Sequence, residues 1–396
     1  MTNYPSAAGT SPQRILALDI MRGFTIAGML LVNDPGSWEH IFSPLRHAEW
    51  NGLTPTDLVF PFFMFIMGVS TFLSLSKLRF EPSRKVIVKV VRRTVVIFFI
   101  GLAIGWFSRF CHYWNHAPSD LTFFRQLWEA SWTFDVQRIP GVLQRLAVCY
   151  CIVAILSLTV SHRRFPVIIA VLLAAYTLLL FLGNGFEYGN GNILAIVDTG
   201  VFTLAHTYND HGIDPEGLLS TIPSIAHVLL GFCVGERLFS TTARTEDIWQ
   251  RTGRLYFLGT MLTLAGWLLS YGCPVNKKIW SPTFVLITCG MATLLLASLI
   301  LMADVWKKQR WSSFFVDFGV NPLALYTFGA LLSILLDSIH ISAFSISCSL
   351  HAWIYTHGLC AVLDPTAASL AYALLFVALC WLPAHWLRSH NLFIKI

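Results

Sequence analysis

The chain has 396 residues, of which 55% are hydrophobic and 12% charged, and its formal net charge is +6. A soluble domain carries about 25% charged residues, and the apolar runs here are too long and continuous for the alternating strands of a membrane β-barrel. The composition therefore excludes an ordinary soluble enzyme, a disordered protein and a nucleic-acid-binding domain, and it predicts an all-α polytopic membrane protein.

A membrane-spanning helix needs about 20 predominantly apolar residues. The sequence predicts ten such helices, at roughly 15–33, 56–76, 94–108, 141–160, 166–183, 218–239, 254–271, 282–303, 318–337 and 366–387. The third stretch is short, so we expect its helix to begin earlier, in the basic residues before it. The stretch 340–362 is apolar but rich in serine and histidine, and we interpret it as a re-entrant or interfacial helix of an outer loop.

The positions of Lys and Arg predict the orientation, because cytoplasmic loops are enriched in them. With both termini cytoplasmic, most of these cations fall inside, including the stretch 77–93 and the basic end Arg388–Lys395. A crossing at 340–362 would put that basic end outside, so ten spans are favoured over eleven. Residues 1–13 read as a polar cytoplasmic tail without the apolar segment of a signal peptide. We expect one domain, covering residues 1–396.

Polar residues inside the spans are costly and therefore informative. In the first span, Asp19 and Arg22 are three residues apart and share a helix face. They either form an ion pair that holds helices together or line a polar shaft through the bundle. Asn33 ends this span on the outer side.

The segment 47–68, HAEWNGLTPTDLVFPFFMFIMG, is the most informative. A histidine is the side chain best suited to move a proton near neutral pH, and His47 lies just outside the membrane. Asp57 stands where an acid favours a helix start, and Pro61 predicts a kink in the second span.

Two further segments place charge near the outer membrane edge. In RIPGVLQRL, Arg138 and Gln144 lie at the start of the fourth span, and Arg145 within it needs an acidic partner or an anionic ligand. In DPEGLLSTIPS, Asp214 and Glu216 form a loose carboxylate pair, which is either a site or a helix cap. Asn321-Pro322 predicts a kink or a polar wall in the ninth span.

Signals for other chemistry are weak. The nine cysteines lie mostly in apolar runs and include no CxxC pair, so we expect small core residues rather than disulfides or metal ligands. His112 and His116 have the spacing of two metal ligands on a helix, but no acidic third ligand is evident, and no metal is predicted. Nucleophile-elbow, HExxH and P-loop motifs do not occur.

Several of these segments, in this order, resemble the heparan-α-glucosaminide N-acetyltransferase family of transmembrane acyltransferases: RILALDIMRG, the long segment after His47, RIPGVLQRL, DPEGLLSTIPS and PVNKKIWSPT. The resemblance runs over nearly the whole chain and implies a bacterial member without the large luminal domain of the animal enzyme. That difference puts the family's polymer substrate in doubt. By the resemblance, His47 is the catalytic histidine and Asn33 is its neighbour in the site.

The resemblance implies that an acetyl group moves from cytosolic acetyl-CoA to the amine of glucosamine or a related amino sugar on the outer side. His47 is then the general base or a transient acetyl carrier, and Asn33 a donor to the thioester oxygen. The residues proposed to hold the phosphates of acetyl-CoA are Arg84, Lys85 and Lys89, together with cations of the loop after the sixth span. The residues proposed to lie elsewhere around acetyl-CoA are Arg138, Gln144 and Arg145. Residues proposed near the acceptor are Asp57, Trp50, Asp214 and Glu216. The outer aromatic residues Trp38, Trp50 and Trp280 either stack on the sugar ring or belong to the interfacial aromatic belt.

The resemblance also implies a homodimer in the lipid bilayer of a bacterial inner membrane. An alternative function is an amino-sugar transporter, whose site should lie near the membrane midplane between broken helices. A third is acylation of a cell-envelope polymer with another acyl donor.

Overall fold

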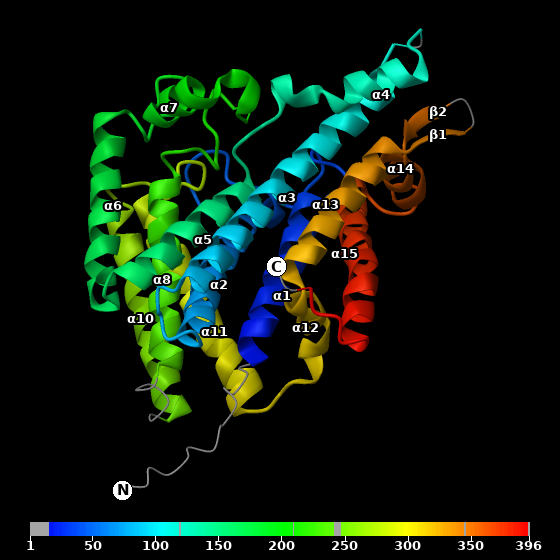
Figure 1. Cartoon of the computed structure of the whole chain (residues 1–396). Helices are drawn as coiled ribbons and strands as arrows, with labels where there is room; N and C mark the ends of the chain where they lie inside the picture. Colours follow the sequence, from blue (N-terminus) through cyan, green and yellow to red (C-terminus); the bar gives the residue numbers. More distant parts are fainter. Residues whose placement is uncertain (1–15, 119, 209, 241–246, 344–345, 395–396) are drawn as a thin grey trace, which may run out of the picture.

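The computed structural model describes residues 16–118, 120–208, 210–240, 247–343 and 346–394, and it is a bundle of long helices (Figure 1). The long helices are α1 (Leu16–Asn33), α2 (Val59–Ser76), α3 (Arg84–His116), α5 (Val142–Thr159), α6 (Phe165–Leu182), α8 (Thr221–Phe239), α10 (Ile248–Leu269), α11 (Pro282–Leu299), α12 (Ser313–Val320) with α13 (Pro322–Ser338), and α15 (Pro365–Ser389). The shorter elements, α4 (Phe123–Ser131), α7 (Ile193–Phe202), α14 (Leu350–Trp353), β1 (His340–Ala343) and β2 (Ile346–Ser349), gather at one end of the bundle (Figure 1).

All ten stretches expected to span a membrane are helical, and the chain is a multi-pass membrane protein. Within the described residues, seven helices are long and apolar enough to cross a bilayer, or up to eight if a bent pair counts as one span. Helices α3 and α10 cover two further expected spans but are not among these. As expected, α3 begins in the basic stretch, at Arg84. The number ten, the orientation and the single-domain organisation stay predictions.

The interpretation of 340–362 as one interfacial or re-entrant helix was wrong. Strands β1 and β2 form an antiparallel hairpin with His340 opposite Ser349. Only the short α14 and a π-helical turn, Ile354–Leu359, follow it. The sequence HISAFSISCS alternates apolar and serine residues, and this two-residue period is typical of a strand rather than a helix.

The kink expected at Asn321-Pro322 is present. Helices α12 and α13 meet there at an angle of 78°, because proline cannot donate the backbone hydrogen bond that would continue α12. The Asn321 side chain takes part in the break: its amide donates to the carbonyl of Leu392 at 2.8 Å, and its oxygen accepts from the backbone N–H of Ile394 at 2.8 Å.

Helices α1, α2, α8 and α11 form the centre of the bundle, whereas only 28% of the span containing α6 is buried. The α2–α8 contact depends on two glycines. A Cβ at Gly68 would lie 2.1 Å from the carbonyl oxygen of Val228, and a Cβ at Gly231 would lie 2.2 Å from that of Phe65. Small residues allow such close backbone approach between membrane helices. This contact holds the start of α2, which follows Asp57, in a fixed place beside α8.

Candidate functional site

A cavity of about 580 Å³ lies where α1 ends and α2 begins. It collects residues from four separate parts of the chain. The five predicted site residues that line it are Asn33, His47, Asp57, Arg138 and Glu216. The structure thus brings the main sequence candidates together, although they are spread over more than 180 positions of the chain.

Asp57 organises the loop that carries His47. Its carboxylate is 1% exposed and lies in a 3₁₀ turn, Pro55–Leu58, directly before α2. One carboxylate oxygen accepts hydrogen bonds from the backbone N–H groups of Ala48 and Thr54, both at 3.1 Å, and the other lies 2.6 Å from His47 Nδ1. The acid expected to favour the helix start does so in a capping box, and it also fixes the histidine ring.

The tautomer of His47 follows from these contacts. Its Nδ1 lies 2.6 Å from Asp57 and 3.0 Å from Lys277 Nζ, and it cannot donate to the first and accept from the second at once. The shorter, charge-assisted contact is the stronger one, so Nδ1–H donates to Asp57. The basic lone pair is then on Nε2. The His47 side chain is 41% exposed and lines the cavity.

Lys277 lies against the same carboxylate, with its Nζ 3.4 Å from Asp57 Oδ1. Burial lowers the pKa of its ammonium group, and the carboxylates of Asp57 and Glu216 partly oppose that shift. Its loop is tied to the loop of His47, because the Gly52 N–H donates to the Val275 carbonyl at 2.8 Å. The site therefore holds a histidine, a carboxylate and a lysine in one contact group.

Arg138 is held by Asp214 and Glu216, a pairing that the sequence reasoning did not predict. Its guanidinium donates to both oxygens of Asp214, at 2.9 and 2.5 Å, and to Glu216 at 2.5 Å. Burial disfavours the Arg138 charge, but these carboxylates outweigh it and raise the pKa of the group above its usual value. Asp214 is 0% exposed and stands behind Arg138 rather than in the cavity. The loose carboxylate pair is thus one half of a buried ion cluster in the cavity wall.

Gln144 and Arg145 lie behind the wall, in the first turn of α5. The Arg145 side chain donates to the carbonyl of Gly217 at 3.1 Å and to the hydroxyl of Ser220. Its guanidinium also stacks 5.2 Å from the ring of Trp280. Among the described residues, the partners of Arg145 are thus a hydroxyl, a carbonyl and an aromatic ring rather than a carboxylate, and the side chain lies against the 217–220 turn.

The aromatic residues proposed for sugar stacking lie apart. Trp280 is only 1% exposed, so the expectation that it offers a surface to a sugar was wrong. Trp50 donates its Nε1–H to the Phe186 carbonyl at 2.9 Å and packs 4.9 Å from the ring of Tyr188, outside the lining of the cavity. Trp38 is exposed on the loop after α1.

A second cavity of about 430 Å³ lies farther along α1 and α2, toward the other end of the bundle. Arg22 and Ser70 line it, together with Lys77 and Lys89. Arg22 donates to Asp19 at 2.9 Å and to Ser70 at 3.2 Å, so the predicted pair exists and also faces a polar cavity. Arg84, Lys85 and Lys89 were proposed to hold the phosphates of acetyl-CoA. Lys89 lines this cavity, whereas Arg84 and Lys85 line neither of these two cavities.

Sequence reasoning missed several polar residues of the first cavity, among them Tyr208, Asp210, Lys277 and Lys278. Lys278 donates to Asp210 at 2.7 Å, and the Tyr188 hydroxyl donates to the same acid. A signal for the lysines existed, because cations are unusual in a loop expected outside. Within the parts of the chain that the structure describes, no three His, Cys, Asp or Glu side chains lie close enough to hold a metal ion.

Comparison with known proteins agrees with the sequence motifs. Residues 15–115 match a family model described as a domain of unknown function, DUF5009. The chain is 31% identical to the human heparan-alpha-glucosaminide N-acetyltransferase over 370 residues, which is 80% of this chain and 52% of the human protein. The mouse heparan-alpha-glucosaminide N-acetyltransferase is 28% identical over 376 residues, covering 81% of this chain and 54% of the mouse protein.

The chain is thus similar, over about 80% of its length, to two heparan-alpha-glucosaminide N-acetyltransferases. The resemblance noted in its motifs is thereby confirmed. The chain spans about half the length of these two relatives. The stretch matched by the family model, 15–115, includes Asn33, His47 and Asp57, three of the residues that meet in the cavity.

Proposed function

We propose that the chain is a membrane-bound N-acetyltransferase that moves an acetyl group from acetyl-CoA to the amine of glucosamine or a related amino sugar. The observation that carries the proposal is the His47–Asp57 pair at the cavity, with Nδ1–H bound to the carboxylate at 2.6 Å and Asn33 in the same cavity wall. A carboxylate that orients a histidine and leaves Nε2 basic is a recurring arrangement for general-base catalysis. The relation to named N-acetyltransferases supports the reaction class.

The reaction then follows from these groups. The amine nitrogen attacks the acetyl carbonyl carbon, and its proton moves to His47 Nε2 as the new C–N bond forms. Asn33 donates a hydrogen bond to the developing oxyanion. The C–S bond breaks, and the proton returns from His47 to the thiolate of coenzyme A. In the alternative order of steps, His47 Nε2 first takes the acetyl group itself and then passes it to the amine. We favour direct transfer.

The donor's route is proposed from the second cavity. Arg22 and Asn33 are on α1, one in each cavity, and 11 residues of helix span about 16 Å. Val59 and Ser70 on α2 have the same separation. The pantetheine arm of acetyl-CoA would lie between these helices, with the phosphates at Lys77 and Lys89, because ammonium groups bind phosphate oxygens through charge-assisted hydrogen bonds.

The first test is product formation by the purified chain in detergent. Acetyl-CoA and glucosamine should give N-acetylglucosamine and free coenzyme A, both measured by mass spectrometry, and a panel of other amino sugars would define the acceptor. If the folded protein binds coenzyme A but acetylates no amine, the acceptor is of another class. If it binds no coenzyme A, the proposal fails, and uptake of amino sugars into proteoliposomes would test the transporter alternative.

Replacing Asp57 by asparagine is expected to lower kcat about 10²-fold, because an amide no longer selects the tautomer with Nε2 basic. The KM for acetyl-CoA should change little, since the proposed donor phosphates lie in the other cavity. The measurement is steady-state kinetics over pH 5 to 9, in which a purely structural role would leave the shape of the kcat profile unchanged. The control is Asp210→Asn in the same cavity, which should keep most of its activity.

Replacing Lys77 and Lys89 together by glutamine is expected to raise the KM for acetyl-CoA about tenfold or more while kcat stays near the wild-type value, because two charge-assisted phosphate contacts are lost. The matched control is Arg84→Gln with Lys85→Gln. It also removes two positive charges, at the start of α3, but neither residue lines the cavity. An equal rise in both double variants would indicate general attraction by the basic face rather than a site.

We further propose that the chain is a multi-pass protein of a bacterial inner membrane, with both termini cytoplasmic and His47 on the outer side. In that orientation acetyl-CoA enters from the cytoplasm and the amino sugar from outside. A homodimer stays a prediction from the resemblance. Labelling of single cysteines introduced at exposed loop positions, with a membrane-impermeant reagent on intact cells, tests the orientation.

A further inference from the structure

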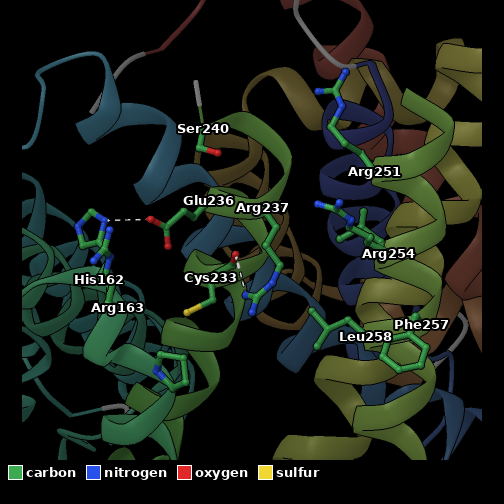
Figure 2. A pocket seen from close by; sticks show the side chains of 12 residues that line it. His162, Arg163, Cys233, Glu236, Arg237, Ser240, Arg251, Arg254, Phe257 and Leu258 are labelled. Atoms are coloured by element: carbon green, nitrogen blue, oxygen red, sulfur yellow. Dashed lines mark hydrogen bonds and ion pairs between the residues drawn. The ribbon is translucent and has the colours of Figure 1, made fainter. Parts of the chain in front are cut away.

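A third cavity, of about 600 Å³, lies at the C-terminal end of α8 (Figure 2). Helix α8 begins at Thr221, close to the Glu216 cluster, and its 19 residues extend about 28 Å to Phe239. The cavity is formed by the last turns of α8, the first turns of α10 and the turn before α6. The proposed catalytic site and donor route lie instead between α1, α2 and their neighbours.

The described residues that line this cavity are strongly basic. Figure 2 shows guanidinium groups from three elements around one space, with a single carboxylate, Glu236, among the lining side chains. The arginines are Arg163, Arg237, Arg251 and Arg254. The Glu236 carboxylate lies 3.4 Å from His162 Nδ1 and is thus directed at a ring rather than a guanidinium.

Two of these arginines, Arg237 and Arg251, donate to backbone carbonyl groups. Arg237 donates to the Cys233 carbonyl at 3.4 Å, and Arg251 donates to the Leu238 carbonyl at 3.1 Å. The Arg251 Nε is buried and has no hydrogen-bond partner among the described residues. A buried donor without a partner is destabilising, and more so when it is charged. This arrangement suits an anion with several acceptor oxygens, since guanidinium groups match phosphate in a forked geometry.

The walls beside the arginines are apolar and face outward. On α10, Phe257 is 68% exposed, and Met261 follows one turn later at 43%. On α6, Val167 and Val171 are 63% and 59% exposed. In a bundle that spans a membrane, such side chains meet acyl chains. The cavity therefore has cations at its polar end and a lipid-facing apolar rim, which is the complement of an amphiphile.

We propose that this cavity binds the phosphate headgroup of an anionic phospholipid from the leaflet at this end of the bundle. The phosphate oxygens accept from Arg237, Arg251 and Arg163, and the acyl chains run along the outward faces of α6 and α10. Basic pockets between membrane helices are suited to such headgroups. The lipid would hold the end of α8 against α10 and α6. The proposal is independent of the reaction catalysed at His47.

The phosphates of coenzyme A would suit the same arginines as a lipid phosphate. The test therefore distinguishes a phospholipid from coenzyme A. Native mass spectrometry of the full chain in detergent would be titrated with dioleoyl phosphatidylglycerol, with dioleoyl phosphatidylcholine and with coenzyme A. We expect phosphatidylglycerol to bind about tenfold more tightly than phosphatidylcholine, which has the same chains. Coenzyme A should not displace it. Equal binding of the two lipids overturns the proposal, and displacement by coenzyme A assigns the cavity to the donor instead.

Variants connect the binding to the cavity. Arg237→Gln with Arg251→Gln should lose the preference for phosphatidylglycerol, whereas Lys308→Gln with Arg310→Gln, which removes equal charge from an exposed loop, should keep it. Retained preference in the first pair contradicts the proposal. If that pair does not fold, wild-type hydrogen exchange decides: phosphatidylglycerol, and not phosphatidylcholine, should slow exchange in 233–240 and 251–258, and uniform protection by both lipids would count against the site.

Discussion

Replacing His47 by alanine is expected to lower kcat for acetyl transfer by about 10³-fold or more, because the reaction loses the group that takes the amine proton. The variant should still bind coenzyme A, since the proposed phosphate contacts lie in the other cavity. The measurement is N-acetylglucosamine formed per enzyme by mass spectrometry, together with binding of coenzyme A by calorimetry. Turnover at the wild-type rate would remove His47 from the mechanism.

The control for this experiment is His40→Ala, an exposed histidine of the same loop that does not line the cavity. It should keep wild-type activity. Incubating the wild type with acetyl-CoA and no sugar distinguishes direct transfer from transfer through an acetylated His47. An acetylated histidine adds roughly 42 Da to the His47 peptide, because one acetyl group replaces one proton. No such gain is expected for direct transfer.

Replacing Arg138 by alanine is expected to destabilise the protein by about 3–5 kcal/mol, because it leaves two carboxylates of the cavity wall without their cation. Asp214 is 0% and Glu216 10% exposed, so water cannot compensate for the loss. The measurement is the free energy of unfolding in mixed micelles with increasing denaturing detergent. A change close to zero would mean that the cluster is solvated in the membrane.

Two further variants test the cause. Adding Asp214→Asn and Glu216→Gln to Arg138→Met should recover part of the lost stability, since neutral groups of similar shape leave no buried charge unpaired. Arg125→Ala removes an arginine whose partner, Glu129, lies on the exposed face of α4, and it should barely change the stability. Equal losses at Arg125 and Arg138 would contradict the assigned role of burial.

Hydropathy predicted the positions of the spans well, because continuous apolar runs such as Leu16–Asn33 and Pro282–Leu299 have few other stable solutions in a bilayer. It failed at 340–362, where total hydrophobicity suggested a helix and the two-residue alternation indicated the hairpin instead. Of the residues taken from the motif segments, Asn33, His47, Asp57, Arg138 and Glu216 line one cavity, whereas the other predicted site residues lie outside its lining.

The sequence did not predict how the loops fold back on themselves. Trp280 was expected in an outer aromatic belt, but the loop around it closes by hydrogen bonds between Asn276 and Ser281, at 2.9 and 3.0 Å, and turns the indole inward. The same turn brings Lys277 to Asp57. The Lys277–Asp57 contact joins residues more than 200 positions apart. It depends on a few specific hydrogen bonds of the turn, which neither periodicity nor charge counting reveals.

Because the Asp57 carboxylate accepts from two backbone N–H groups with one oxygen and from His47 with the other, a single side chain determines both the shape of the loop and the orientation of the base. Neither property can be altered at this position without the other. Second mutations that restore the loop after a change at 57 should therefore fail to restore turnover. An adaptive walk toward a new acyl acceptor would leave this position untouched and proceed through Tyr208, Asp210 and Lys278, which line the same cavity without holding the base.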